Sequence, residues 1–330
     1  MQLKKLAIVG LGSIGCRHLR LLKELNPDLY IVLVRSGKGQ PWPEEEAMAS
    51  LTVSSLDQAL SIGIQAAIIA TPAPFHISAA MKLAKAGIHL LIEKPLSDSL
   101  VAVNELLECA KTSRITVLVG YVLRHDPAAK KFKEWLRNDR IGRLINIGIE
   151  CDSYLPDWRP NQDYRNTVSA LPELGGGVLL ELSHELDYLH WFFGKPSQVQ
   201  ALLSNSGTLD IKVEDQADIL FIDREKRPIS MHLGFNRRQP VRSCKVLTTE
   251  GVLKWYVIEK QVIWEPKDGE PVVEKFEFDR DYIYRVQMLH FFSCIENGER
   301  PSVTLHDGAE VMFLVDAIKR ANDCGMKVEV

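Results

Sequence analysis

The sequence predicts an α/β protein in which a parallel β-sheet is followed by a second, strand-rich part. From residue 6 to about residue 120, short apolar runs bounded by turn residues alternate with segments of helical period, which is typical of βαβ units. A glycine-rich turn, Gly10 to Gly15, lies between the first apolar run and the first helical segment. Beyond residue 193, strand-like runs dominate, and two helices close the chain.

The elements of the parallel sheet follow from the apolar runs and their spacing. We expect strands at residues 6–9, 30–34, 66–70, 89–92 and 116–119. Helical periodicity between them predicts helices at residues 14–25, 56–61, 75–86 and 99–111. Ser97 or Asp98 is the expected cap of the last of these helices.

The second part begins with a helix at 127–138, which has a proline in its first turn. A strand at 144–151 leads into an irregular segment that runs to residue 175, and such a long segment is usually functional, disordered or a misread element. A helix at 178–193 precedes strands at residues 199–203, 217–222, 229–235, 245–247, 252–257, 261–264 and 272–278. Helices at 282–297 and 306–323 end the chain.

Length, charge and cysteine spacing narrow the class of function. The chain has 330 residues, 46% of them hydrophobic, which is enough for two domains. A net charge of -3 with both signs dispersed excludes a nucleic-acid or anionic-membrane surface, and no apolar run is long enough to span a membrane. The six cysteines show neither zinc spacing nor a disulfide framework, and no signal-peptide pattern precedes the first strand. We therefore expect a cytoplasmic protein with a small-molecule partner.

The glycine turn matches G-x-G-x-x-G in the context that this pattern requires, between a strand and a helix. Gly10 permits the tight turn, Gly12 lets the backbone approach a pyrophosphate, and Gly15 lets the helix pack closely on the strand. Ser13 and Ile14 open the helix, whose N-terminal N–H groups suit phosphates. An ordinary glycine-rich turn is the alternative, but the βα units that follow favour dinucleotide binding.

The residue after the second strand bears on the choice of dinucleotide. An NAD site usually has an acidic residue there, which binds the ribose 2′-hydroxyl, whereas this sequence has Arg35-Ser36. A guanidinium suits a 2′-phosphate and offers no acceptor for a hydroxyl proton. The sequence therefore favours NADP over NAD, with stacking of Arg35 on the adenine or simple solvation as alternatives.

Glu93-Lys94-Pro95 ends an apolar strand at the carboxyl edge of the sheet, where open α/β sheets bind ligands. A lysine at this place can donate a hydrogen bond to a substrate oxygen and favour its deprotonated form. A surface lysine in a turn is the alternative.

The helix at 178–193 has a second group of polar residues. Its apolar side chains form one stripe at 100° per residue, whereas Glu181 and His184 share another face with Asp187 at its border. An imidazole between carboxylates is a plausible proton relay near neutral pH, and a solvated helix face is the alternative. His184 has no histidine four residues further on, so we expect no metal site.

Taken together, these motifs resemble the glucose-fructose oxidoreductase and inositol dehydrogenase superfamily (Gfo/Idh/MocA type) over nearly the whole chain. The matching stretches are Gly10 to Gly15, Ala70-Thr71-Pro72 with His76, Glu93-Lys94-Pro95, Gly120 to Arg124, Gly175 to Asp187 and the final helix from about His306. The resemblance implies a Rossmann domain at 1–121 and an α+β substrate and oligomerisation domain at 122–330, with an open, mostly antiparallel sheet. It also implies a last helix, about 306–324, packing back near the first domain, and a homodimer or homotetramer.

The resemblance also implies roles for individual residues. Lys94 matches the family's catalytic lysine, and His184 matches its catalytic histidine. A hydride would move between the nicotinamide and a ring carbon of a sugar, inositol or nucleotide-sugar, while His184, assisted by Lys94, exchanges the hydroxyl proton. The positions that match the cofactor lining are Thr71, Pro72, His76 and Glu93. The residues that could reach the substrate are Tyr121, Arg124, Trp158, Arg159 and Tyr164.

The sequence departs from the family next to the histidine. Many members have an aspartate four residues before it, but here Leu180 has that place and Glu181 lies three residues before His184. Either Glu181 replaces the aspartate or Asp187 orients His184.

Three functions remain open. The leading one is a sugar or nucleotide-sugar dehydrogenase or reductase. The others are a glycosidase that retains NAD and cleaves by transient oxidation, and a cofactor-sensing regulator without turnover. Lys94 and His184 argue against the regulator, because a sensor needs no proton relay, whereas the glycosidase would show no net change in free cofactor.

Overall fold

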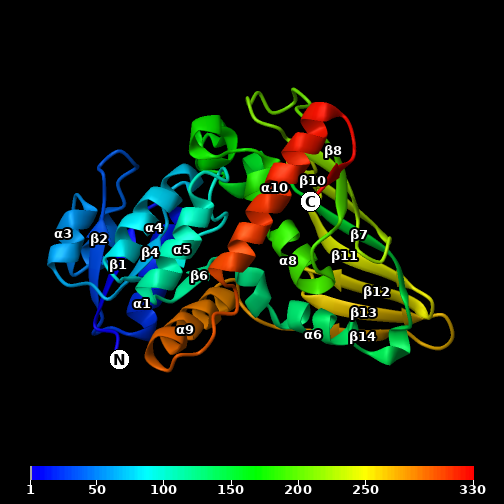
Figure 1. Cartoon of the computed structure of the whole chain (residues 1–330), viewed down its shortest axis with the longest axis horizontal. Coiled ribbons are helices and arrows are strands. Elements are labelled where there is room, and N and C mark those ends of the chain that lie inside the picture. Colours follow the sequence, from blue (N-terminus) through cyan, green and yellow to red (C-terminus); the bar gives the residue numbers. More distant parts are fainter. Residues whose placement is uncertain (1) are drawn as a thin grey trace. The chain divides into compact units, whose positions relative to one another are not determined.

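The computed structural model describes residues 2–330, which form two compact units (Figure 1). The first unit comprises the residues up to Val122 together with Asp279–Ala309, and the second comprises Leu123–Phe278 and Glu310–Val330. The sequence predicts a single boundary after residue 121, whereas Asp279–Ala309 belong to the first unit as well.

The first unit is built on a six-stranded parallel sheet with the strand order β3-β2-β1-β4-β5-β6. Its strands are β1 (Lys5–Val9), β2 (Tyr30–Val34), β3 (Leu51–Val53), β4 (Ala66–Ile69), β5 (His89–Ile92) and β6 (Val117–Val119). Leu6, Ala7 and Ile8 of β1 are completely buried, as expected for a strand with helices on both faces of its sheet. The strand order reverses at β1, between β2 and β4, and ligands of such sheets bind at the carboxyl edge beside the reversal.

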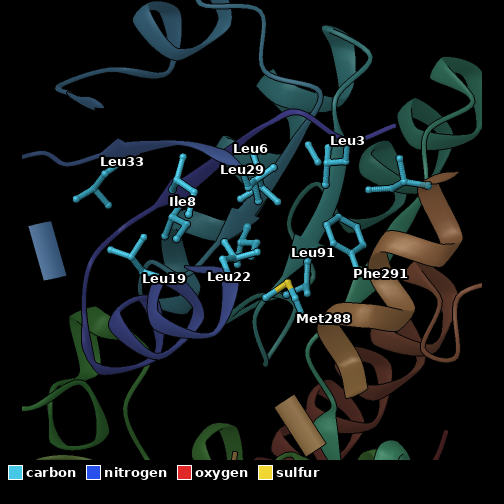
Figure 2. Close-up of a cluster of buried hydrophobic side chains, with 14 of the residues drawn as sticks. Leu3, Leu6, Ile8, Leu19, Leu22, Leu29, Leu33, Leu91, Met288 and Phe291 are labelled. Carbon is cyan, nitrogen blue, oxygen red and sulfur yellow. The ribbon is translucent and has the colours of Figure 1, made fainter. Parts of the chain in front are cut away.

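The helices of this unit complete its core. They are α1 (Ser13–Leu25), α2 (Pro43–Met48), α3 (Leu56–Ser61), α4 (His76–Lys85), α5 (Val103–Ser113) and α9 (Tyr282–Glu296). Figure 2 shows Met288 and Phe291 of α9 packed with Leu22 of α1 and Leu91 of β5 in one buried cluster. This apolar face explains why α9, far along the chain, belongs to the first unit.

The second unit contains a nine-stranded sheet with the order β14-β13-β12-β11-β7-β10-β9-β8-β15, antiparallel except for the parallel pair β7 and β10. Its strands are β7 (Leu144–Asp152), β8 (Gln198–Ser204), β9 (Gln216–Ile222), β10 (Pro228–Gly234), β11 (Val241–Thr248), β12 (Gly251–Tyr256), β13 (Gln261–Pro266), β14 (Val272–Lys275) and β15 (Val328–Glu329). Burial alternates along β9 and β10, which is typical of a sheet with one covered and one open face.

The helices associated with the second unit are α6 (Pro127–Trp135), α7 (Val178–Glu181), α8 (His184–Phe193) and α10 (Leu305–Cys324), the last of which begins in the first unit. Aromatic rings fasten α6 and α8 to the sheet. The ring of Tyr188 in α8 lies 5.2 Å from that of Trp255 in β12, and Phe132 in α6 lies 5.2 Å from Phe192 in α8. These contacts fix the orientation of α8, which begins at His184.

The predicted fold class is confirmed, but several predicted elements differ. The single helix expected at 178–193 is wrong, because Leu182 and Ser183 separate α7 from α8. The expected cap of the helix after β5 is also wrong, since α5 begins after Ala102, a left-handed residue without a side-chain cap. The short elements α2, β3 and β15 were not predicted. Within residues 2–330, no helix is both long and apolar enough to cross a membrane.

Candidate functional site

The glycine turn has the geometry that close approach of a phosphate requires. Gly10 has φ +92°, and a Cβ at this position would lie 3.0 Å from the carbonyl oxygen of Ala70. A Cβ on Gly15 would lie 2.4 Å from the carbonyl oxygen of Gly10, so this glycine lets α1 begin directly against the turn. A Cβ on Gly12 would meet no described atom within 4 Å. Gly10 and Gly15 are thus required by packing, whereas Gly12 leaves an open approach to the backbone.

The residues around this turn fit a dinucleotide. Ser13 and Ile14 open α1, whose first N–H groups have no partner within the helix and suit an anion. No acidic residue lies in the first turn of α1 to oppose a phosphate. Thr71, whose Cγ2 would lie 3.0 Å from a Cβ on Gly10, has a buried hydroxyl oxygen without a hydrogen-bond partner among the described residues. A buried hydroxyl without a partner is uncommon and is consistent with a ligand at this position.

Arg35 directly follows β2. The end of β2 lies beside the glycine turn, since the carbonyl of Val34 accepts a hydrogen bond of 3.0 Å from the N–H of Gly10. Its guanidinium already has protein partners. It forms an ion pair with Glu46 of α2 and donates a 2.7 Å hydrogen bond to the carbonyl of Gln40. Ser36 is exposed next to it. Glu46 was not singled out from the sequence, since nothing in the spacing relates it to Arg35.

Glu93 and Lys94 follow β5 at the carboxyl edge of the sheet. Glu93 is 6% exposed, and its Oε1 lies 2.6 Å from Nε2 of the fully buried His18 in α1. The other carboxylate oxygen accepts a hydrogen bond of 3.2 Å from the backbone N–H of Lys94. Gly120 leaves room for this carboxylate, because a Cβ there would lie 2.9 Å from Glu93 Oε2. The backbone of Lys94 is thus tied through Glu93 to the helix that follows the glycine turn.

The predicted residue His76 joins two segments of the same edge. The imidazole is 1% exposed, with Nδ1 2.9 Å from the carbonyl oxygen of Pro95 and Nε2 2.6 Å from that of Thr71. Burial lowers the pKa of His76 from its usual value. Pro72 precedes the short turn Ala73–Phe75, which leads into α4. His76 therefore fastens the Thr71 turn to the segment after Lys94.

Tyr284 of α9 is a further residue of this region that sequence reasoning missed. Its ring packs against the edge of His18 and lies 4.6 Å from the guanidinium carbon of Arg17. Burial raises the pKa of Tyr284, and the negative charge of Glu93 raises it further. Arg17 also forms a 3.0 Å ion pair with Asp281. The return of α9 to the first unit thus covers the His18–Glu93 pair.

In the second unit, two predicted site residues contact each other. Nε of Arg124 lies 3.0 Å from Asp187 Oδ2, and Nη2 lies 2.7 Å from Oδ1. Both side chains are at most 5% exposed, and the guanidinium carbon lies 5.7 Å from the ring centre of Trp191. The sequence motifs predict that Arg124 reaches the substrate and that Asp187 is one of two carboxylates that could orient His184, whereas in the structure both carboxylate oxygens of Asp187 accept hydrogen bonds from Arg124.

Glu181 and His184 lie on either side of the break between α7 and α8. Both are half-buried, and Oε1 of Glu181 accepts a 3.0 Å hydrogen bond from the hydroxyl of Ser169. The next residue, Glu185, is fully buried and forms a 2.6 Å ion pair with Arg242 of β11. The pair was not predicted from the sequence, because Arg242 lies 57 residues from Glu185 and no spacing relates the two.

The predicted substrate residues are distributed over both units. Tyr121 is fully buried and belongs to the first unit, whereas the others belong to the second unit. Trp158 donates a 2.9 Å hydrogen bond to Ser153, and the Tyr164 hydroxyl donates a 2.8 Å bond to the carbonyl of Leu209. Arg159 is half-buried in the same irregular segment.

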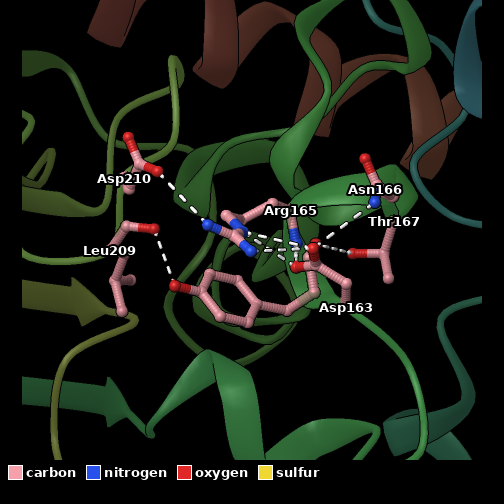
Figure 3. A network of polar contacts seen from close by, with 7 residues as sticks. Asp163, Arg165, Asn166, Thr167, Leu209 and Asp210 are labelled. Carbon is pink, nitrogen blue, oxygen red and sulfur yellow. Dashed lines mark hydrogen bonds and ion pairs between the residues drawn. The ribbon is translucent and has the colours of Figure 1, made fainter.

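The irregular segment is held by a polar network that includes Asp163, Arg165 and Asp210, shown in Figure 3. The guanidinium of Arg165 lies 2.9 Å from Asp163 and 3.4 Å from Asp210. The hydroxyl of Thr167 donates a 2.6 Å hydrogen bond to the carbonyl of Tyr164. These contacts connect the segment to the loop between β8 and β9, and the segment contains four short 3-10 turns that the sequence did not predict.

Comparison with known proteins identifies the family of both parts of the chain. Residues 4–121 match the model described as the oxidoreductase family, NAD-binding Rossmann fold. Residues 133–330 match the model of the same family's C-terminal alpha/beta domain. Together these matches cover almost the whole chain.

Relatives from two organisms match over most of their length. A 1,5-anhydro-D-fructose reductase of Ensifer adhaerens is 25% identical over 281 residues, which is 81% of this chain and 80% of that protein. A myo-inositol 2-dehydrogenase of Thermotoga maritima is 22% identical over 337 residues, which is 96% of each protein.

A solved structure has the same fold. Levoglucosan dehydrogenase in complex with NADH and levoglucosan superposes with a TM-score of 0.87 and 18% identity, covering 99% of both chains. The resemblance inferred from the motifs is therefore confirmed by the matches to both domains. The chain belongs to the oxidoreductase family of glucose-fructose oxidoreductase and inositol dehydrogenase, and it is an enzyme of the dehydrogenase and reductase class.

Proposed function

We propose that this enzyme transfers a hydride between a nicotinamide dinucleotide and a ring carbon of a sugar, nucleotide-sugar or inositol-like substrate, interconverting CH–OH and C=O. When bound, the nicotinamide supplies or accepts the hydride. The single observation that supports the proposal most is the series of contacts that links α1, the helix after the glycine turn, to Lys94: His18 of α1 contacts Glu93, and Glu93 accepts a hydrogen bond from the N–H of Lys94. The names of two relatives, a 1,5-anhydro-D-fructose reductase and a myo-inositol 2-dehydrogenase, agree with this substrate class.

Lys94 has the role of a hydrogen-bond donor to the reacting oxygen in this proposal. Its position directly after β5 is the carboxyl edge at which open α/β sheets bind ligands. An ammonium group beside this oxygen stabilises the negative charge that develops on it when the hydroxyl proton leaves.

His184 exchanges the proton of the same hydroxyl group. A histidine suits this step because its unperturbed pKa lies close to neutral pH. We assign Glu181, rather than Asp187, as the carboxylate that supports it, since the bidentate Arg124 already balances the charge of Asp187. Tyr121, Arg124, Trp158, Arg159 and Tyr164 remain the proposed substrate residues.

Two further properties belong to the proposal. The open sheet face exposes Leu202 and Leu220 of neighbouring strands, at 61% and 44%, which supports a homodimer or homotetramer through this face. The cysteines are free thiols, which supports a reducing compartment such as the cytoplasm.

The decisive experiment is turnover against a panel of free sugars, nucleotide-sugars and inositols with both NAD(P)⁺ and NAD(P)H. We expect net reduction or oxidation of the cofactor with at least one member. The Lys94→Ala variant should lower kcat by about 10² or more, the range of general acid–base catalysis, while cofactor affinity stays nearly unchanged. Product formation without a net change in free cofactor would favour the NAD-retaining glycosidase instead, and unchanged turnover would remove Lys94 from the mechanism.

A further inference from the structure

Arg35 has the position from which a Rossmann domain is expected to contact the adenosine ribose. In a Rossmann domain, the residue after the second strand of the βαβ unit contacts the ribose 2′ position. Arg35 has this place, directly after β2, and its N–H donates a 2.9 Å hydrogen bond to the carbonyl of Val53 of β3. Its backbone is therefore hydrogen-bonded to the end of the neighbouring strand β3.

The side chain of Arg35 is engaged by a carboxylate from another element. Glu46 lies in α2, and its Oε1 pairs with Nη1 of Arg35 while accepting a 3.2 Å hydrogen bond from the N–H of Trp42. The side chain of Arg35 is 13% exposed and that of Glu46 is 30% exposed. The pair is thus partly shielded from water, so its mutual attraction is stronger than that of a fully exposed ion pair.

Such a carboxylate affects the two dinucleotides differently. The 2′-phosphate of NADP(H) needs the guanidinium that Glu46 now holds, and it would bring a second negative charge to the same cation. The 2′-hydroxyl of NAD(H) is uncharged, and it can donate a hydrogen bond to a carboxylate. Glu46 of α2 therefore offers the kind of carboxylate that NAD sites usually have directly after the second strand.

We propose that Glu46 is a specificity-determining residue for the cofactor, whose carboxylate competes with a 2′-phosphate for Arg35 and so weakens NADP(H) binding without weakening NAD(H) binding. The inference rests on the proposed function, because it assumes that a dinucleotide binds at the glycine turn.

The test measures binding directly, by titrating the purified full chain with NADH and NADPH and following protein fluorescence. Glu46→Gln removes the charge and keeps the size of the side chain. We expect it to bind NADPH about tenfold more tightly than the parent, because a close like-charge contact is lost, and to bind NADH within about twofold of the parent. Adenosine 2′,5′-bisphosphate should show the same gain, whereas adenosine 5′-monophosphate should not.

Glu44→Gln is the matched control, since Glu44 lies in the same helix turn and is exposed. It changes the net charge equally and should leave both affinities unchanged. Adding Glu46→Gln to an Arg35→Ala variant should no longer tighten NADPH binding. Glu46→Ala, which removes the carboxylate by a different change, should reproduce the gain.

The inference is overturned if Glu46→Gln and Glu44→Gln behave alike, or if the gain persists without Arg35. A parent protein that binds neither dinucleotide contradicts the proposed function itself, so the two failures are distinguishable.

Discussion

His18 and Glu93 form a buried pair in which Nε2 and Oε1 lie 2.6 Å apart, 75 residues distant in sequence. The pair joins α1, which follows the glycine turn, to the residue before Lys94. Because Glu93 also accepts a hydrogen bond from the N–H of Lys94, a displacement of His18 is transmitted to the backbone of the proposed catalytic lysine. His18 acts as a positioning residue in this arrangement.

Replacing His18 by Leu should lower both stability and turnover. The change leaves the buried carboxylate of Glu93 without the imidazole, and a buried charged acceptor that loses its partner destabilises by about 1–3 kcal/mol or more. Denaturant unfolding measures this loss. If the pair positions Lys94, kcat should also fall while KM for the sugar changes little.

The exposed pair of Lys82 and Asp57 provides the control, with a distance of 2.7 Å and side chains that are 42% and 76% exposed. Asp57→Asn should change the free energy of unfolding by less than about 1 kcal/mol and leave kcat unchanged. A His18→Leu variant with normal kcat would show that the pair only stabilises the fold.

The parallel sheet could be predicted from the sequence because its strands are short, buried on both faces and separated by helices of clear period. The turn from Gly10 to Gly15 could also be predicted, because its three glycines form a local pattern between a strand and a helix. The break at Leu182 and Ser183 could not, because the apolar period continues through it. The ion pairs of Glu46 with Arg35 and of Glu185 with Arg242 could not be predicted either, since only tertiary packing brings these partners together.

His232 gives a prediction for the pH dependence of stability. It lies on β10 between Asp218, at 2.7 Å, and Asp152, at 3.6 Å. Hydrogen bonds to these carboxylates raise the pKa of His232 from 6.5 to about 9. The folded state therefore holds this proton more tightly than the unfolded chain. The resulting stabilisation is fully present below pH 6.5 and is lost as the pH rises towards 9.

Denaturant unfolding at pH 6 and pH 9 checks this sign. The parent should lose stability between the two, and His232→Gln should remove part of that loss. Because the side chain is about one-third exposed, solvent screening keeps the effect well below the value that the pKa shift alone implies. An equal loss in the two proteins would assign the pH dependence to other groups.

The preference between NADPH and NADH tests the interpretation of Arg35. If its guanidinium binds a 2′-phosphate once the competing carboxylate of Glu46 is removed, NADPH should bind more tightly than NADH in the Glu46→Gln protein. Arg35→Asp should reverse or erase this preference, because a carboxylate repels the phosphate and accepts a hydrogen bond from a ribose hydroxyl. Equal affinities for NADPH and NADH in the Glu46→Gln protein would contradict the interpretation. Titration at fixed ionic strength is required, since salt screens such contacts.

Replacing Asp187 should mainly lower stability, whereas replacing Glu181 should mainly alter the pH dependence of turnover. Asp187→Asn leaves Arg124 as a buried cation with a neutral partner, so we expect a destabilisation of up to about 3–5 kcal/mol, the range for breaking a buried ion pair. Glu181 is half-buried and hydrogen-bonded to Ser169, so Glu181→Gln should change stability little. It should instead shift the pH–rate profile of kcat, because the charge that favours the protonated imidazole is removed. A shifted profile in Asp187→Asn with none in Glu181→Gln would reverse the assignment of the supporting carboxylate.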